Sequence, residues 1–153
     1  MNVYWDTSAI VKRYLAEAGS SAVVNLLRQD PVSGTVVVTR AEMAGVFSRA
    51  FSRAKITENQ LNQGMRNFRQ HWPAFLRIRI TEPMIRDADH LAIEYNLRGY
   101  DAVHLAGALI WKDRVADTIL FATFDDNLWR AAVAEGFEPF PERLPSRVLA
   151  GKR

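Results

Sequence analysis

The sequence contains no cysteine among its 153 residues. This absence excludes disulfide frameworks, zinc sites built on thiolates and cysteine nucleophiles, and it is compatible with a reducing compartment. Long hydrophobic runs are also missing. The longest uncharged apolar stretch, from about Ala102 to Trp111, is interrupted by His104 and is shorter than the roughly 20 residues that cross a bilayer. We therefore expect a buried helix there and no membrane span.

No leader with a basic start and an apolar centre precedes the first apolar stretch at residues 2–5, which predicts a soluble, cytoplasmic protein. A strong excess of one charge is absent too, because 20 Lys and Arg face 17 Asp and Glu, for a net charge of +3. This mildly basic balance permits nucleic-acid binding without indicating it. The length fits one domain. We assign residues 1–140 to that domain and residues 141–153 to a basic C-terminal tail.

Strands and helices are predicted to alternate along the chain. Apolar, β-branched or alternating stretches predict strands at residues 2–5, 35–39, 75–80, 118–124 and 137–140, with Gly34 in a loop before the second. Apolar spacing of three and four predicts helices at about residues 7–15, 20–27, 41–55, 58–72, 83–95, 100–112 and 126–135. This alternation predicts a doubly wound α/β fold with a mostly parallel sheet of about five strands between helices.

Four acidic residues follow strands or open helices in this predicted fold. Asp6 and Asp125 come directly after apolar strands, and Glu42 and Asp101 lie in the first turns of helices. Because these positions meet at one edge of a parallel sheet, we expect the four carboxylates to converge. Crowded carboxylates stay ionised with a cation between them, and their oxygens suit Mg²⁺ or Mn²⁺. Such ions can activate water and stabilise the leaving oxygen of a phosphodiester.

Each acid also has an ordinary structural explanation, because acids at helix N-termini cap free N–H groups and suit the helix dipole. The joint placement of all four at one predicted edge favours a site. Asp101 adds to this, because an acid beside an apolar, central helix is costly without a partner. The fourth position is ambiguous, since Asp125 and Asp126 are adjacent and point in different directions.

The stretches around these acids resemble the four motifs of PIN-domain nucleases, and most closely those of VapC-like toxins of type II toxin–antitoxin systems. The resemblance covers residue 1 to about residue 140, and the stretches are Trp5-Asp6-Thr7-Ser8-Ala9, Arg40-Ala41-Glu42, Gly99-Tyr100-Asp101-Ala102-Val103-His104-Leu105-Ala106 and Ala122-Thr123-Phe124-Asp125. It implies an Mg²⁺- or Mn²⁺-dependent endoribonuclease, frequent homodimerisation and a cognate antitoxin whose tail covers the site.

Carried over position by position, the resemblance makes Asp6, Glu42, Asp101 and Asp125 the catalytic, metal-binding acids. It makes Ser8 and Thr123 hydrogen-bonding partners that orient the carboxylates, although plain capping explains both equally well. It favours Asp125 over Asp126, which we then expect to cap the following helix. His104 shares a helix face with Asp101, but a lone histidine among apolar residues predicts a hydrogen-bonded core residue rather than a general base.

Basic residues suggest where RNA could lie. Arg49 and Arg53 follow Glu42 by seven and eleven residues, which returns both to nearly the same helix face. Such a row could lead a phosphate backbone toward the acids. The further candidates are Lys12, Arg13 and Arg98. The alternative is a solvated basic face or an antitoxin contact.

Three other functions fit parts of the pattern. A phosphoryl-acceptor receiver domain would need paired acids after the first strand and a lysine after the last, and both are missing here. A catalytically silent PIN-fold binding module is disfavoured by the presence of all four acids. A nuclease that acts on DNA, or in RNA processing without an antitoxin, stays open because both polymers offer the same phosphodiester.

Overall fold

The computed structural model describes residues 1–144, so most of the predicted basic tail, residues 145–153, lies outside the described residues. Five parallel strands form one sheet in the order β3-β2-β1-β4-β5. The strands are β1 (Asn2–Trp5), β2 (Val32–Val36), β3 (Leu76–Ile78), β4 (Ile119–Ala122) and β5 (Glu138–Phe140). The structure confirms the doubly wound α/β fold that the sequence predicts.

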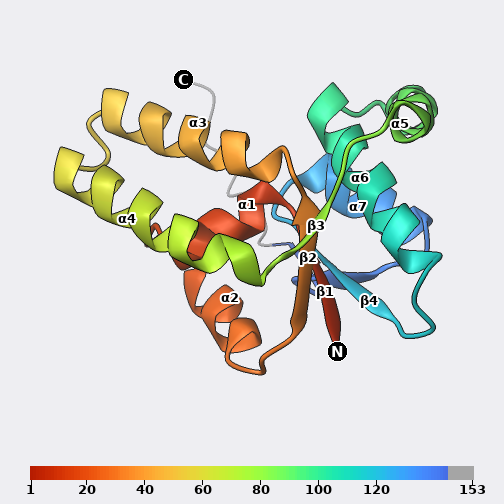
Figure 1. The fold of residues 1–153 in the computed structure, drawn as a ribbon, viewed down its shortest axis with the longest axis horizontal. Coiled ribbons are helices and arrows are strands. Elements are labelled where there is room, and N and C mark those ends of the chain that lie inside the picture. The colour runs from red at the N-terminus through yellow and green to blue at the C-terminus, as the bar shows by residue number, and fades with distance from the viewer. Residues whose placement is uncertain (145–153) are drawn as a thin grey trace, which may run out of the picture.

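Within the described part of the chain, seven α-helices cover the two faces of the sheet (Figure 1). One face carries α1 (Thr7–Ile10), α2 (Ser20–Leu27), α3 (Thr39–Ser52) and α4 (Glu58–His71), with a 3-10 turn at Val11–Arg13 and another at Trp72–Ala74. The other face carries α5 (Glu82–Tyr95), α6 (Gly99–Lys112) and α7 (Asp126–Ala134). Alternate residues of β1 divide the core, since Val3 and Trp5 pack toward α1–α4 and Tyr4 packs toward α5–α7. Within residues 1–144 no helix is both long and apolar enough to cross a membrane.

The second strand lies three residues earlier than predicted, at Val32–Val36 instead of residues 35–39. Gly34 belongs to this strand rather than to a loop. A Cβ at Gly34 would lie 2.4 Å from Cζ3 of Trp111, so the glycine lets helix α6 pack against the sheet. Thr39 consequently starts α3 instead of ending a strand.

The remaining elements differ from prediction mainly in length. β3 keeps three of the six predicted residues, and the first helix is only one α-turn followed by the 3-10 turn. α6 is buried along most of its length, as its apolar sequence predicts. Strand order reverses at β1, whose neighbours are β2 and β4, so the ends of β1 and β4 form the switch point where open α/β sheets bind ligands.

Candidate active site

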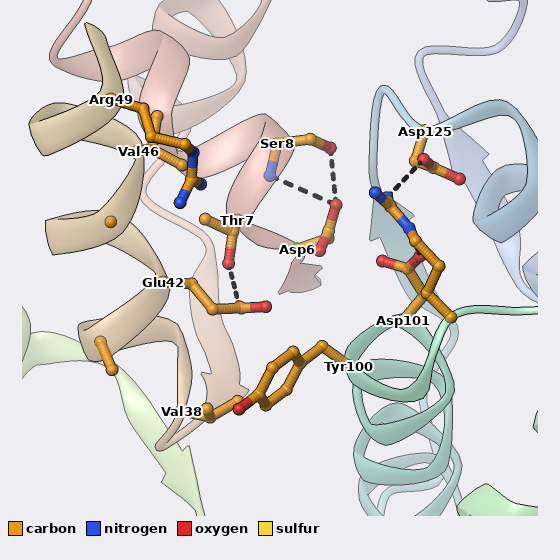
Figure 2. A pocket seen from close by; sticks show the side chains of 13 residues that line it. Asp6, Thr7, Ser8, Val38, Glu42, Val46, Arg49, Tyr100, Asp101 and Asp125 are labelled. Carbon is orange, nitrogen blue, oxygen red and sulfur yellow. Dashed lines mark hydrogen bonds and ion pairs between the residues drawn. The ribbon is translucent and has the colours of Figure 1, made fainter. Parts of the chain in front are cut away.

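The four acids line one cavity of about 470 Å³ at this edge of the sheet (Figure 2). Asp6 follows β1, Asp125 follows β4, and Glu42 and Asp101 lie in the first turns of α3 and α6. Their convergence follows from the topology, because parallel strands deliver their carboxyl ends, and the helices that follow them their N-termini, to the same edge. Four residues that are far apart in the sequence therefore face one space.

Hydrogen bonds hold the Asp6 carboxylate in place. Its Oδ2 accepts from Ser8 Oγ at 2.6 Å, from the Ser8 backbone N–H at 3.2 Å and from Thr123 Oγ1 at 2.9 Å. Ser8 Oγ in turn accepts from the backbone N–H of Phe124 at 2.8 Å, which ties the start of α1 to the end of β4. Only 4% of Asp6 is exposed. Ser8 and Thr123 thus contact Asp6 in the way that orients a carboxylate, while Ser8 N also makes Asp6 the cap of α1.

Glu42 is held by Thr7 and by a buried histidine. Thr7 Oγ1 donates to Glu42 Oε2, and His104 Nε2 donates to the same oxygen at 2.7 Å. His104 is wholly buried, its Nδ1 lies 3.1 Å from the hydroxyl of Tyr4, and its Nε2 lies 3.5 Å from Asp6 Oδ1. His104 is therefore the hydrogen-bonded core residue that the sequence predicts, and it also touches two of the acids.

Glu42 and His104 stabilise each other's charged forms. Burial raises the pKa of Glu42, but hydrogen bonds from His104 and Thr7 and the nearby positive charges outweigh it, so the net pKa is lowered. Burial lowers the pKa of His104, but the negative charges of Asp6 and Glu42 outweigh it and raise the net pKa. Both pKa shifts favour an ionised Glu42 carboxylate facing a protonated His104 imidazole.

The other two acids are bridged by Arg98, the residue that precedes α6. Its Nε donates to Asp101 Oδ2 at 2.9 Å, and its terminal nitrogen Nη2 donates to Asp125 Oδ2 at 3.2 Å. Burial raises the pKa of Asp101, and the charges of Asp6 and Asp125 add to this rise against the lowering effect of Arg98. The guanidinium thus supplies the positive charge that the crowded carboxylates require.

Asp125 has a structural role as well. Its Oδ1 accepts from the backbone N–H of Leu128 at 2.9 Å, so Asp125 is the N-cap of α7. The prediction that Asp126 caps this helix is therefore wrong. Asp126 is the first helical residue, does not line the cavity, and pairs with Arg130 at 3.6 Å. The cap falls on Asp125 because its extended backbone places the carboxylate over the free N–H groups of the first turn.

Some of the basic residues proposed to bind RNA line the acidic cavity and others do not. Arg49 lines the cavity together with the four acids, whereas Arg53 ends α3 and does not line it. Lys12 and Arg13 also lie outside the cavity, and Lys12 pairs with Glu17 at 2.8 Å. Arg49 and Arg98, which also lines the cavity, are therefore the two candidates placed to meet a ligand beside the acids.

The donor chemistry of the cavity fits a hard divalent cation. Four carboxylates supply oxygen ligands of the kind that Mg²⁺ and Mn²⁺ prefer. Within residues 1–144 no three acidic or histidine side chains are arranged closely enough to hold a metal ion as they stand. Arg98 supplies positive charge in this space, because its guanidinium bridges Asp101 and Asp125. The fit to a divalent cation therefore lies in the chemistry of the four oxygen donors rather than in their present spacing.

Three contacts of the site were not foreseen in the sequence. Thr7 directly follows Asp6, yet the motif assigns it no role. Arg98 is predicted only as an RNA contact, although its position three residues before Asp101 allows an ion pair across one helical turn. Tyr100 is predicted to belong to a buried helix, yet it is exposed and lines the cavity.

Comparison with known proteins points to one family. Residues 3–134 match the family model described as PIN domain. The chain is 32% identical over 142 residues to Ribonuclease VapC45 of Mycobacterium tuberculosis (strain CDC 1551 / Oshkosh) and, equally, to Ribonuclease VapC49 of Mycobacterium tuberculosis (strain ATCC 25618 / H37Rv). Each match covers 93% of this chain and 96% of the relative. A solved structure, "Toxin-antitoxin complex from Klebsiella pneumoniae", has the same fold with a TM-score of 0.58 at 17% identity, over 82% of this chain and 87% of that chain.

Proposed function

The chain belongs to the PIN-domain family, and from this premise we propose that it is an endoribonuclease that depends on Mg²⁺ or Mn²⁺. The two relatives from Mycobacterium tuberculosis are named ribonucleases and match over nearly the whole chain. The observation that carries the proposal is the cavity itself, where four carboxylates from four separate elements face one space. An all-oxygen cluster of this kind serves phosphodiester hydrolysis without a protein nucleophile.

We assign the metal to Asp6, Glu42, Asp101 and Asp125. A bound Mg²⁺ or Mn²⁺ would polarise a water molecule and neutralise the charge that develops on the phosphodiester. The protein contributes orientation. Thr7 fixes one oxygen of Glu42, and the hydroxyls bonded to Asp6 fix one of its oxygens.

Arg49 is our candidate for holding the substrate. Its side chain reaches toward Thr7 and Glu42 from the next turns of α3 (Figure 2). A guanidinium there can bind a phosphate of the RNA backbone by two parallel hydrogen bonds. It would also offset part of the repulsion between the phosphate and the four acids.

We propose further that the protein acts as the toxin of a type II toxin–antitoxin pair, in the cytoplasm and as a homodimer. The support is its similarity to VapC ribonucleases and its fold likeness to a protein from a toxin–antitoxin complex. A gene for a small DNA-binding protein directly upstream would support an antitoxin. Induced expression of the natural protein beside the Asp101→Asn variant tests toxicity, which should disappear in the variant.

The nuclease assignment is tested by cleavage of tRNA and of single-stranded DNA with Mn²⁺, and again after chelation. We expect cleavage of RNA that stops on chelation and falls at least about 100-fold in Asp6→Asn, because losing a ligand should cost no less than losing an outer partner. Asp126→Asn is the matched control, since this acid lies next to the site without lining the cavity. An Asp6→Asn protein that cuts as well as its parent would refute the mechanism, and preferential cutting of DNA would refute the substrate.

A further inference from the structure

A second hollow adjoins the candidate active site. It has a volume of about 510 Å³, lies between α5 and the start of α6, and shares Arg98 and Tyr100 with the acidic cavity. Its walls are mainly apolar and come from Ile85, Ala88, Ala92 and Val103. We call it the α5–α6 groove. Because the two hollows have lining residues in common, a substrate held at the acids can extend into the groove.

The aromatic side chain at this junction is unusually open. Tyr100 is 62% exposed, although it stands at the start of a helix that is buried along most of its length. Its ring projects from α6 toward Val38, which lines the acidic cavity (Figure 2). An exposed aromatic beside a site for a phosphodiester is the usual platform on which single-stranded RNA stacks a base.

We propose that the α5–α6 groove is a nucleobase subsite, in which one base of the substrate RNA stacks on Tyr100 beside the bond to be cut. This inference rests on the proposed ribonuclease function and adds a determinant of sequence preference to it. The flat faces of a base suit the apolar walls, and the ring of Tyr100 supplies the stacking surface.

The charges around the groove decide which part of a nucleotide enters it. Helix α5 carries four acids and one basic residue, namely Glu82, Asp87, Asp89, Glu94 and Arg86. A phosphate backbone would be repelled from this helix, whereas a neutral base would not be. Arg49 attracts phosphate on the opposite side of the acidic cavity, from α3. The backbone should therefore follow α3 while the base turns toward α5.

Asp89 gives the groove a preference among bases. It lines the groove, and within residues 1–144 it makes no ion pair. A carboxylate only accepts hydrogen bonds, so it selects bases that donate. Guanine offers two neighbouring N–H donors on one edge, which match the two oxygens of a carboxylate, whereas uracil offers a single donor. We therefore expect guanine to be favoured in this subsite.

Gly99 provides a way to block the groove without disturbing the fold. It lines the groove, and a Cβ built on it meets no other atom within 4 Å. Gly99→Leu should therefore fill the groove and leave the protein folded. Tyr100→Leu removes the stacking ring, and Tyr100→Phe keeps it. Asp87→Asn is the matched control for Asp89→Asn, because Asp87 is also on α5 but does not line the groove.

The first experiment measures kcat/KM for short RNAs that differ in one base near the cut. We expect the natural protein to favour one position with guanine. Tyr100→Leu and Gly99→Leu should each lower kcat/KM for the guanine RNA by on the order of tenfold, the usual contribution of one stacked base. Gly99→Leu and Asp89→Asn should also reduce the preference for guanine, whereas Tyr100→Phe and Asp87→Asn should keep both the rate and the preference. An unchanged kcat/KM for the guanine RNA in both Tyr100→Leu and Gly99→Leu overturns the proposal.

The second experiment separates this inference from the ribonuclease function. Guanosine and uridine monophosphates are titrated into the natural protein and into Gly99→Leu, with NMR shifts of Val103 and Tyr100 as the readout. Saturable shifts with guanosine monophosphate that vanish in Gly99→Leu support the subsite even if no RNA is cut. If Gly99→Leu instead changes the molar mass measured by light scattering and no nucleotide shifts these residues, the groove holds a second copy of the chain and the proposal fails.

Discussion

Replacing Arg98 with alanine should tighten the binding of Mn²⁺. The guanidinium makes ion pairs with Asp101 at 2.9 Å and with Asp125 at 3.2 Å, and a metal ion that uses these carboxylates must displace it. Since 79% of the Arg98 side chain is exposed, each pair is of the weak surface kind, worth about 0.2–1 kcal/mol. Two such pairs sum to at most about 2 kcal/mol, so Arg98→Ala should lower the Kd for Mn²⁺ by about 2- to 30-fold.

Calorimetric titration of Mn²⁺ into the purified variants measures this effect directly. Arg49→Ala is the matched control, because Arg49 lines the same cavity but no ion pair joins it to the acids. It reports the general effect of removing one positive charge near a dication. The Kd of Arg98→Lys for Mn²⁺ should lie between those of the parent and Arg98→Ala, since an ammonium group cannot bridge two carboxylates as the planar guanidinium does. If Mn²⁺ binds Arg98→Ala no more tightly than Arg49→Ala, Arg98 does not compete with the metal.

Three further predictions follow from the packing and the charges. Gly34→Ala should lower the free energy of unfolding by about 1–3 kcal/mol in urea denaturation, because its Cβ would overlap the packed tryptophan ring of α6; an unchanged midpoint would contradict the packing. His104→Leu should lower the free energy of unfolding by about 1–3 kcal/mol, because it removes the His104 partner of the buried Tyr4 hydroxyl. Adding Tyr4→Phe should recover part of this loss in the same assay. Additive losses would contradict the contact between Tyr4 and His104. Arg49→Ala should reduce the slope of log K against log salt for RNA binding by about 0.7 to 0.9, while Arg53→Ala should leave it nearly unchanged; equal slopes would remove Arg49 from the RNA path.

The sequence predicts the layers of this fold well because local patterns encode them. Apolar strands separated by amphipathic helices specify a parallel sheet covered on both faces, and each predicted strand exists. The predicted position of the second strand is wrong because glycine is typical of turns, whereas Gly34 lies inside this strand. Its real role, close approach to Trp111, depends on a contact between residues 77 positions apart, which local pattern does not contain.

The convergence of the acids could also be predicted, since topology alone brings strand ends and helix starts to one edge. The contacts that surround the acids could not be predicted from the sequence. His104 reaches Glu42 across 62 positions of sequence, and the groove beside Tyr100 depends on how α5 and α6 pack. The sequence predicts that Asp125 lines the site and that Asp126 caps α7, but Asp125 does both. One of its oxygens caps α7, while the other faces the cavity and Arg98. Side-chain direction at a helix start follows from backbone geometry rather than from residue type.

We propose that these carboxylates hold a divalent cation. Crystals grown with Mn²⁺ and measured at a wavelength where manganese scatters anomalously test it without reference to activity. We predict an anomalous peak in the acidic cavity, about 2.0–2.3 Å from oxygens of Asp6 and at least one of the other three acids, with Arg98 turned away from Asp101. A peak elsewhere, or a cavity without a peak and with Arg98 still bridging its two acids at saturating Mn²⁺, would contradict the account.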